Sequence, residues 1–307
     1  MTFLELIKKF PTEQSCIDYY LKIRYPNGIH CNHCGSFKVY QRTKNLKAFT
    51  CNDCYDSFSP FTGTIFEKSS TDLRKWFYAI HLFLNSKKGI SGLQLQREIG
   101  VTYKTAWRML QQIRLAMGNS TQKEFFDTIV EIDETYIGGK PRKDNEHDDN
   151  LPKGTGTGAK RGRGTSKTPV VGIVDRLNKQ VYAKIAMPDK DGKKLTAKQL
   201  MDVLNTVLKA DNGNTIMTDE FRGYDPLRKN NFIHLRVDHT KAFSDYNGTH
   251  TNNIESFWAT LKRGVYGIYH HISVKHMQRY VDEFCFRYNN RGMNMFDMVL
   301  RQSLVIG

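Results

Sequence analysis

The segment TIVEID (residues 128–133) is a short run rich in β-branched residues that ends in an acid. NTIMTDE (214–220) repeats that pattern, and both are typical of buried strands. Between them, PVVGIVDR (169–176) and QVYAKIAM (180–187) predict a hairpin with its turn near residues 177–179. We therefore expect this half of the chain to be built around a β-sheet.

Amphipathic helical patterns fill most of the remainder of this half. They lie at residues 197–210, 252–265 and 273–290, and HLRVDH (234–239) is a further expected strand. Strands first, followed by strands and helices in alternation, predict a mixed sheet covered by helices. We expect an α/β domain over residues 125–292 and a C-terminal tail over 293–307.

The charge balance of the chain indicates its class of partner. Among 307 residues, 46 Lys and Arg stand against 31 Asp and Glu, a net charge of +15. Such a surface attracts polyanions, of which nucleic acid is the commonest. An acidic protein or an acidic membrane surface is the alternative.

The N-terminus and the isolated cysteines favour an intracellular protein. The first residues lack a basic start followed by a long apolar run, and no stretch is apolar enough to cross a membrane. We therefore expect a cytoplasmic location, associated with the nucleoid if the host is bacterial. Cys16 and Cys285 stand in apolar helical patterns and are interpreted as packed core thiols.

Four cysteines form two C-x-x-C pairs in the front of the chain. Residues 1–25 predict a short helical segment, and 26–66 form a Gly-, Asn- and Cys-rich module without helical period. The pairs are Cys31 with Cys34 and Cys51 with Cys54, with 16 residues between them. Four thiolates at zinc-ribbon spacing suit a tetrahedral, structural Zn²⁺ with no open position for a substrate. A redox role is the alternative, and the spacing argues against it.

Residues 67–120 have a helical pattern, and 91–117 resemble a helix-turn-helix. Trp107, Leu110 and Ile113 are expected to face the core. The polar side chains of the second helix, which suit contacts with phosphates and base edges, are Lys104, Thr105, Arg108, Gln111, Gln112 and Arg114. A purely structural helical hairpin is the alternative, and the preceding ribbon and the net charge favour DNA.

A polar insertion separates two expected strands between residues 138 and 168. Its second half, KGTGTGAKRGRGTSK, has five basic residues, five glycines and no acid. This composition predicts a flexible cationic loop. A solubilising linker is one interpretation. We favour a loop whose Lys160, Arg161 and Arg163 contact the DNA backbone.

Three acids are placed where a sheet and a helix can bring them together. Asp133 ends the expected strand TIVEID, Asp219 ends the expected strand NTIMTDE, and Glu255 lies in an amphipathic helix. Three converging carboxylates would bind Mg²⁺ or Mn²⁺, and two such ions would support displacement at phosphorus. By alternation, Glu131 shares the face of Asp133 and is a substitute candidate. Lys262 lies two turns after Glu255 and could hold a DNA phosphate.

Long motifs resemble the insertion-sequence transposases of the IS1595 type, in the ISXO2-like group. The motifs are FSPFTGTIFEKS, WFYAIHLFLNSKKGISGLQLQREIGVTYKTAWRML, VEIDETYIGGK, VVGIVDR, MTDEFRGY, HTNNIESFWATLKRGVYGIYHHIS and KHMQRYVDEFCFRYNNR. Together they cover nearly the whole chain.

The resemblance implies a ribonuclease-H-like domain with a DDE acid triad and a following lysine. Carried over by motif, these are Asp133, Asp219, Glu255 and Lys262, with 35 residues between the second and third acids. It also implies that the ribbon and helix-turn-helix bind terminal inverted repeats in double-stranded DNA. The implied activity is hydrolysis that frees 3′-hydroxyls, which then attack target DNA. A homodimer or larger synaptic assembly follows from the need for two ends.

Two other functions remain open at this point. One is a DNA-binding regulator on a catalytically silent remnant, which a broken triad would indicate. The other is a structure-selective nuclease that cuts without joining, which has no need of DNA-reading modules at its front.

Overall fold

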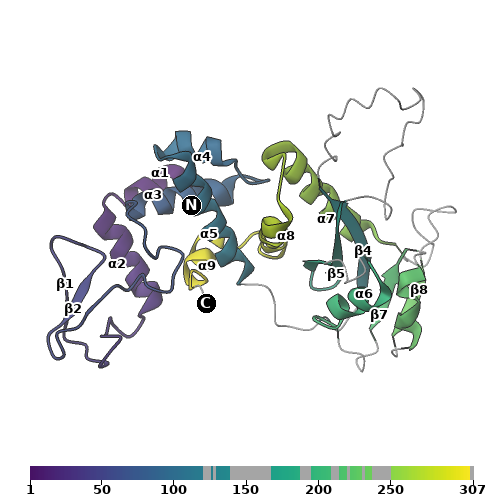
Figure 1. Cartoon of the computed structure of the whole chain (residues 1–307), viewed down its shortest axis with the longest axis horizontal. Helices are drawn as coiled ribbons and strands as arrows, with labels where there is room; N and C mark the ends of the chain where they lie inside the picture. Colours follow the sequence, from purple (N-terminus) through teal and green to yellow (C-terminus); the bar gives the residue numbers. More distant parts are fainter. Residues whose placement is uncertain are drawn as a thin grey trace, which may run out of the picture. The chain divides into compact units, whose positions relative to one another are not determined.

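The structure is a computed structural model in which residues 1–119, 126, 129–138, 167–186, 195–208, 214–219, 222–229, 232–236 and 250–304 are described. The chain divides into two compact units. The first consists of Met1–Ser120 and Gly292–Gly307, and the second of Thr121–Arg291. Figure 1 shows the elements of each unit.

The first unit combines a small three-stranded sheet with six helices in its described part. In chain order these are α1 (Phe3–Lys9), α2 (Glu13–Arg24), β1 (Val39–Gln41), β2 (Phe49–Cys51), β3 (Ser57–Phe58), α3 (Leu73–Asn85), α4 (Gly92–Ile99), α5 (Tyr103–Gly118) and α9 (Met295–Arg301). The strands are antiparallel in the order β1-β2-β3. Helices surround a core rich in aromatic side chains.

Local sequence signals set the helix boundaries of this unit. Thr12 caps α2, and its hydroxyl accepts a hydrogen bond from the backbone N–H of Ser15. Helix α4 ends at Gly100, whose φ of 60° is the left-handed conformation that glycine adopts without a Cβ penalty. Thr102 caps α5 two residues later. The left-handed Gly100 and the cap at Thr102 together produce the tight turn between α4 and α5.

The last residues form a helix in place of the expected tail. Helix α9 packs against α2, α3 and α5, so the end of the chain completes the first unit (Figure 1). The ring of Phe296 contacts Phe10 and Phe77, with ring centroids 6.2 and 5.4 Å away. Aromatic burial of this kind stabilises a small helical core strongly. These contacts join segments that are far apart in the sequence, so local patterns could not place the last helix.

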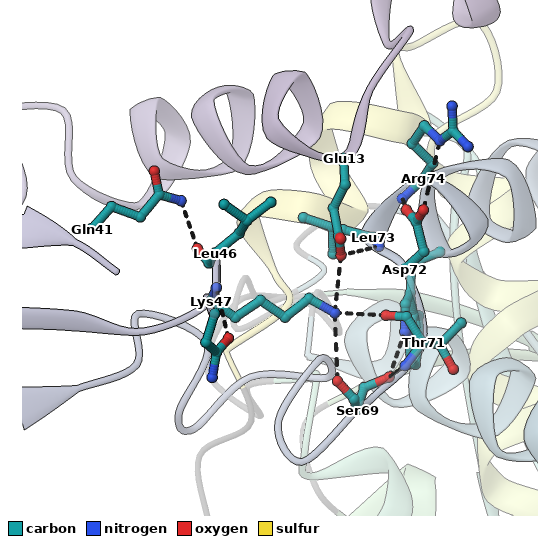
Figure 2. A network of polar contacts seen from close by, with 11 residues as sticks. Glu13, Gln41, Leu46, Lys47, Ser69, Thr71, Asp72, Leu73 and Arg74 are labelled. Carbon is teal, nitrogen blue, oxygen red and sulfur yellow. Dashed lines mark hydrogen bonds and ion pairs between the residues drawn. The ribbon is translucent and has the colours of Figure 1, made fainter. Parts of the chain in front are cut away.

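Lys47, just before β2, joins the zinc-ribbon sheet to the helices (Figure 2). Its ammonium lies 3.2 Å from a carboxylate oxygen of Glu13 and donates to the carbonyl of Thr71 at 2.6 Å. The same Glu13 oxygen accepts from the backbone N–H of Leu73 at 2.9 Å, at the start of α3. One ion pair therefore ties the ribbon to the ends of two helices.

The second unit contains a five-stranded mixed sheet among its described residues. Its elements are β4 (Ile129–Ile137), β5 (Thr168–Asp175), β6 (Gln180–Ile185), α6 (Ala197–Leu204), β7 (Thr215–Thr218), the 3-10 helix η3 (Arg222–Lys229), β8 (Ile233–Arg236), α7 (Asn252–Gly264), the π-helix η4 (Val265–Tyr269) and α8 (Val274–Asn289). The strand order is β6-β5-β4-β7-β8. Pairs β4–β5 and β5–β6 are antiparallel, while β4–β7 and β7–β8 are parallel.

Helices cover both faces of this sheet, as expected for the ribonuclease-H-like class. Val130 and Ile132 of β4 pack with α6 and η3 on one face. Ile137 of β4 packs with α7 and α8 on the other. Because side chains alternate along a strand, Glu131 and Asp133 point toward the α7 side. The fold class predicted from the sequence is confirmed. Within the described residues, no helix is long and apolar enough to cross a membrane.

Glu131 fixes the N-terminus of α7 to the sheet. Its side chain is 0% exposed and accepts from the backbone N–H groups of Asn253 and Ile254 at 2.9 and 3.1 Å. Arg176 donates to the same carboxylate at 2.7 Å. The hypothesis that Glu131 substitutes for Asp133 in a metal site is therefore wrong, because its oxygens are already used by these donors.

Replacing Lys47 with Met should lower the free energy of unfolding of the first unit by about 1–2 kcal/mol, since charge-assisted hydrogen bonds of a partly buried ammonium are lost. Urea unfolding would measure the change. Lys44→Met, at an exposed position three residues earlier, is the matched control and should be neutral. Equal stability of the Lys47→Met and wild-type proteins would refute the anchoring role.

Replacing Glu131 with Gln should cost about 3 kcal/mol, because it breaks a buried ion pair and weakens the cap of α7. Glu255→Gln makes the same chemical change at an exposed position of the same helix and should have little effect on stability. Thermal and urea unfolding of both variants would test this. Similar stabilities of the two variants would contradict it.

Candidate active site and metal centres

Three carboxylates gather at β4. Asp133 and Glu134 are consecutive on that strand, and Asp219 directly follows the parallel neighbour β7. One oxygen from each carboxylate lies within 4.8 Å of the other two. Two of the acids were predicted to converge. Glu134 was not among the predicted ligands, because strand alternation places it on the opposite face from Asp133.

Burial and mutual repulsion dominate the electrostatics of this cluster. Burial, followed by the negative charges of Glu134, Asp219 and Glu255, raises the pKa of Asp133 to about 7. The same two causes raise the pKa of Tyr224 well above its ordinary value. A cation at this place would relieve the repulsion, and carboxylate oxygens are the ligands that Mg²⁺ and Mn²⁺ prefer. The donor set therefore fits a divalent ion.

Two neutral donors orient the carboxylates of β4. The indole N–H of Trp258, on α7, donates to Asp133 at 3.1 Å. The hydroxyl of Tyr224, on η3, donates to Glu134 at 2.8 Å. Neither donor was predicted from the sequence. Trp258 follows Glu255 by one helical turn, which is a signal that could have suggested it.

Helix α7 carries the remaining predicted residues of the site. Glu255 is exposed in its first turn, and the hydroxyl of Thr251 donates to it at 3.1 Å. Its negative charge contributes to the raised pKa of Asp133. Its carboxylate is not part of the group formed by Asp133, Glu134 and Asp219, whose oxygens lie within 4.8 Å of one another. Lys262 is partly buried in the last turn. The structure thus brings Glu134 into the cluster and leaves Glu255 beside it.

The four cysteines of the ribbon also converge. Their sulfur atoms all lie within 4.8 Å of one another, and the pairs Cys31–Cys54 and Cys34–Cys51 are 3.6 Å apart. These separations are far too long for disulfides. A tetrahedron with Zn–S bonds of ~2.3 Å has sulfur–sulfur edges of about 3.8 Å, so the sulfurs fit a zinc ion.

Backbone donors prepare the thiolates for that ion. The N–H groups of His33 and Asp53 each lie 3.4 Å from the sulfur two residues before them, on Cys31 and Cys51. Backbone hydrogen bonds from Cys54 and Asp53 lower the pKa of Cys51 to about 7. Since metals bind the thiolate form, these backbone hydrogen bonds favour the metal-binding form of Cys51.

The predicted DNA-contacting residues of α5 have varied surroundings. Lys104 is exposed, and Thr105 and Gln112 are partly exposed. The hydroxyl of Thr105 lies 3.0 Å from that of Thr102, the cap of the helix. Arg108 donates to the backbone carbonyl of Glu67 at 2.8 Å. Lys160, Arg161 and Arg163 of the insertion lie outside the described residues.

The pattern-based assignment of faces on α5 was wrong at three positions. Gln111 and Arg114 are buried, although they were expected on the DNA-facing side. The guanidinium of Arg114 lies 5.1 Å from the ring centroid of Phe83. Trp107, which was expected in the core, is exposed. A rotation of about 100° per residue makes helix faces sensitive to such small errors.

Replacing Cys51 with Ser should reduce bound zinc from one ion per chain to none and unfold the ribbon, because ligand loss removes much of the free energy that folds such a module. Metal analysis of the purified protein would measure it. Cys16→Ala removes a buried thiol from the same unit and should retain zinc. Retention of zinc by Cys51→Ser would exclude the four-cysteine site.

The sequence matches two family models. Residues 126–289 match the ISXO2-like transposase domain, and residues 11–57 match a transposase zinc-ribbon domain. A protein of the transposable element ISH50 from Halobacterium salinarum is 31% identical over 84% of this chain and 87% of its own length. A transposase-like protein of Haemophilus influenzae is 30% identical over 34% of this chain and 80% of its own length.

Solved structures with some similarity include the Mos1 strand transfer complex and a pre-cleavage Mos1 transpososome. Both have a TM-score of 0.30, with 17% and 14% identity. The alignments cover 75% and 74% of this chain, and 79% and 77% of those chains. Scores this low carry no argument about the site. From its domain match and its relatives, the chain belongs to the ISXO2-like family of the IS1595 type and is a DDE transposase.

Proposed function

We propose that this transposase binds the terminal inverted repeats of its element, hydrolyses the DNA at those ends and joins the freed 3′-hydroxyls to target DNA. The convergence of Asp133 and Asp219 is the observation that carries the proposal. Helix α7 adds Glu255 and Lys262 from a position fixed to the same sheet by Glu131. Double-stranded DNA is the substrate class that this combination of acids and basic charge suits.

The proposed metal ligands are Asp133, Asp219 and Glu255, which would hold two Mg²⁺ or Mn²⁺ ions. Such ions supply an activated oxygen nucleophile and stabilise the leaving oxygen. The raised pKa of Asp133 supports the assignment, because burial and then the neighbouring negative charges disfavour its ionised form, and a cation at this place would offset both. Glu134 lies within the same group and is a further candidate ligand.

The chain's own side chains hold the reacting groups in place. The indole N–H of Trp258 donates to one carboxylate oxygen of Asp133 and orients that side chain. The hydroxyl of Tyr224 fixes Glu134. The cation of Lys262 is suited to hold a DNA phosphate near the acids. Because these donors are already in position, the carboxylates would need little rearrangement during the reaction.

The front of the chain is proposed to recognise the DNA ends. The ribbon over residues 26–66 and the helix-turn-helix over 67–120 would bind the inverted repeats, and the domain over 125–292 would cut and join. Exposed Lys104 supports a backbone contact in this region. Because two ends must be joined together, a homodimer or larger assembly is proposed.

A strand-transfer assay tests the function. Purified protein, Mn²⁺ or Mg²⁺, the DNA ends of its element and a supercoiled target plasmid should yield joined products. Asp133→Asn should lower the rates of cleavage and joining by about 1000-fold or more, because a proposed ligand of the catalytic metal ions is lost. End binding, measured by fluorescence anisotropy, should stay close to wild type because the DNA-reading surface is unchanged.

The same assay separates the alternatives. Cleavage without joining would indicate a nuclease, and end binding without either reaction in folded protein would indicate a regulator. Loss of end binding in Asp133→Asn would mean that the residue is structural. Asn can still accept the Trp258 hydrogen bond, so misfolding is not expected, and thermal unfolding of the variant checks this.

A further inference from the structure

The solvent-facing side of α5 begins with two large aromatic residues. Tyr103 is 50% exposed and Trp107 is 38% exposed, and Lys104 beside them is also exposed. At about 100° per residue, Trp107 lies about 40° and Lys104 about 100° from Tyr103 around the helix axis. The three side chains therefore form one continuous stripe over the first turns. We call this stripe the α5 surface.

The α5 surface is held in place by its neighbours. A Cβ atom on Gly92 would lie 2.9 Å from the ring of Tyr103, so only glycine lets that ring rest against the start of α4. Thr102 caps the helix by accepting from the N–H of Thr105 at 3.2 Å. An aromatic ring that is positioned before binding loses little conformational entropy when a ligand arrives.

Charge around the α5 surface points to one kind of occupant. Residues 87–107 contain four Lys or Arg, all exposed or partly exposed, and a single acid, Glu98. Two copies of such a face repel each other, whereas a polyanion is attracted to it. A contiguous exposed apolar patch rimmed by polar residues is typical of an interaction site. In the major groove of DNA, apolar side chains contact thymine methyl groups and lysines contact phosphates or guanine.

We infer that Tyr103 and Trp107 are the base-contacting residues of the helix-turn-helix, with Lys104 on the adjacent backbone or a guanine edge. This rests on the proposed recognition of DNA ends and names the surface that performs it. Gln111 and Arg114 are buried and Arg108 donates to the carbonyl of Glu67, so we do not assign the reading of the DNA sequence to these three residues. The reading surface is thus aromatic rather than formed by the predicted polar side chains.

Tryptophan fluorescence gives a direct measurement of occupancy. The chain has three tryptophans, and Trp76 and Trp258 are 0% and 3% exposed. Quenching by acrylamide therefore reports mainly on Trp107. Duplex DNA carrying the element's own end should protect this fluorescence, and Trp107→Phe should remove the quenchable component. Unchanged quenching at saturating end DNA would overturn the inference.

Variants then test discrimination between sequences. Trp107→Ala and Tyr103→Ala should each weaken binding to the end duplex by about tenfold while affecting an unrelated duplex less. Lys104→Ala should also lower the slope of log affinity against log salt by about 1. Gly92→Ala should reproduce the Tyr103→Ala effect by displacing the ring. Leu177→Ala, an exposed apolar residue of the β5–β6 turn, is the control and should bind as wild type.

The outcomes distinguish this inference from the function on which it rests. If the wild-type protein binds end and unrelated duplexes equally, recognition of ends fails, and the base-contacting role fails with it. If wild type discriminates and the folded, zinc-loaded variants discriminate equally well, only the α5 surface is excluded. If Trp107→Ala alters the oligomeric state and leaves DNA binding intact, the surface covers a second copy of the chain and the inference is overturned.

Discussion

The carboxylate of Glu131 is the contact on which the geometry of the acid site depends. The N-cap residue of helix α7, Thr251, makes no side-chain cap bond, and the N–H groups of Asn253 and Ile254 take their acceptor from the neighbouring strand. A negative charge there also interacts favourably with the positive end of the helix dipole. Arg176 neutralises the same carboxylate and keeps its burial tolerable. Strand β4 and helix α7, which carry most of the site, are thereby held in a fixed position relative to each other.

A missing side chain on β5 completes that arrangement. Gly172 pairs with Asp133 in the sheet, and a Cβ there would lie 2.5 Å from the ring of Trp258. Because this position is glycine, the indole of Trp258 can approach the sheet closely enough to donate its hydrogen bond to Asp133. The ring of Trp258 thus occupies the space that a side chain at position 172 would fill, and the hydrogen bond from the indole is a consequence of this close packing.

Local patterns predicted the features of this chain that are themselves local. The spacing of Cys31 and Cys34 defines a metal turn, and the β-branched runs before Asp133 and Asp219 define strands. The expected strand end at Asp133 was wrong, because β4 continues through the alternating residues that follow to Ile137, whereas β7 does end directly before Asp219. The function of Glu131 and the hydrogen bond between Tyr224 and Glu134 were not predicted, because they join segments that are distant in sequence. Trp107 was misplaced because a helical period fits two adjacent faces almost equally well when the apolar stripe is broad.

Asp133 shows why the site needs so firm a framework. With a pKa of about 7, its ionised form is disfavoured by burial and by the neighbouring acids, so the folded protein loses stability as pH rises from about 4, the ordinary value, toward 7. Glu131, Trp258 and Tyr224 hold the acids together against this repulsion. A bound cation favours the ionised form and returns that free energy, so cation binding and folding stability are linked. The proposed divalent ion would therefore offset both the burial of Asp133 and its repulsion by the neighbouring acids.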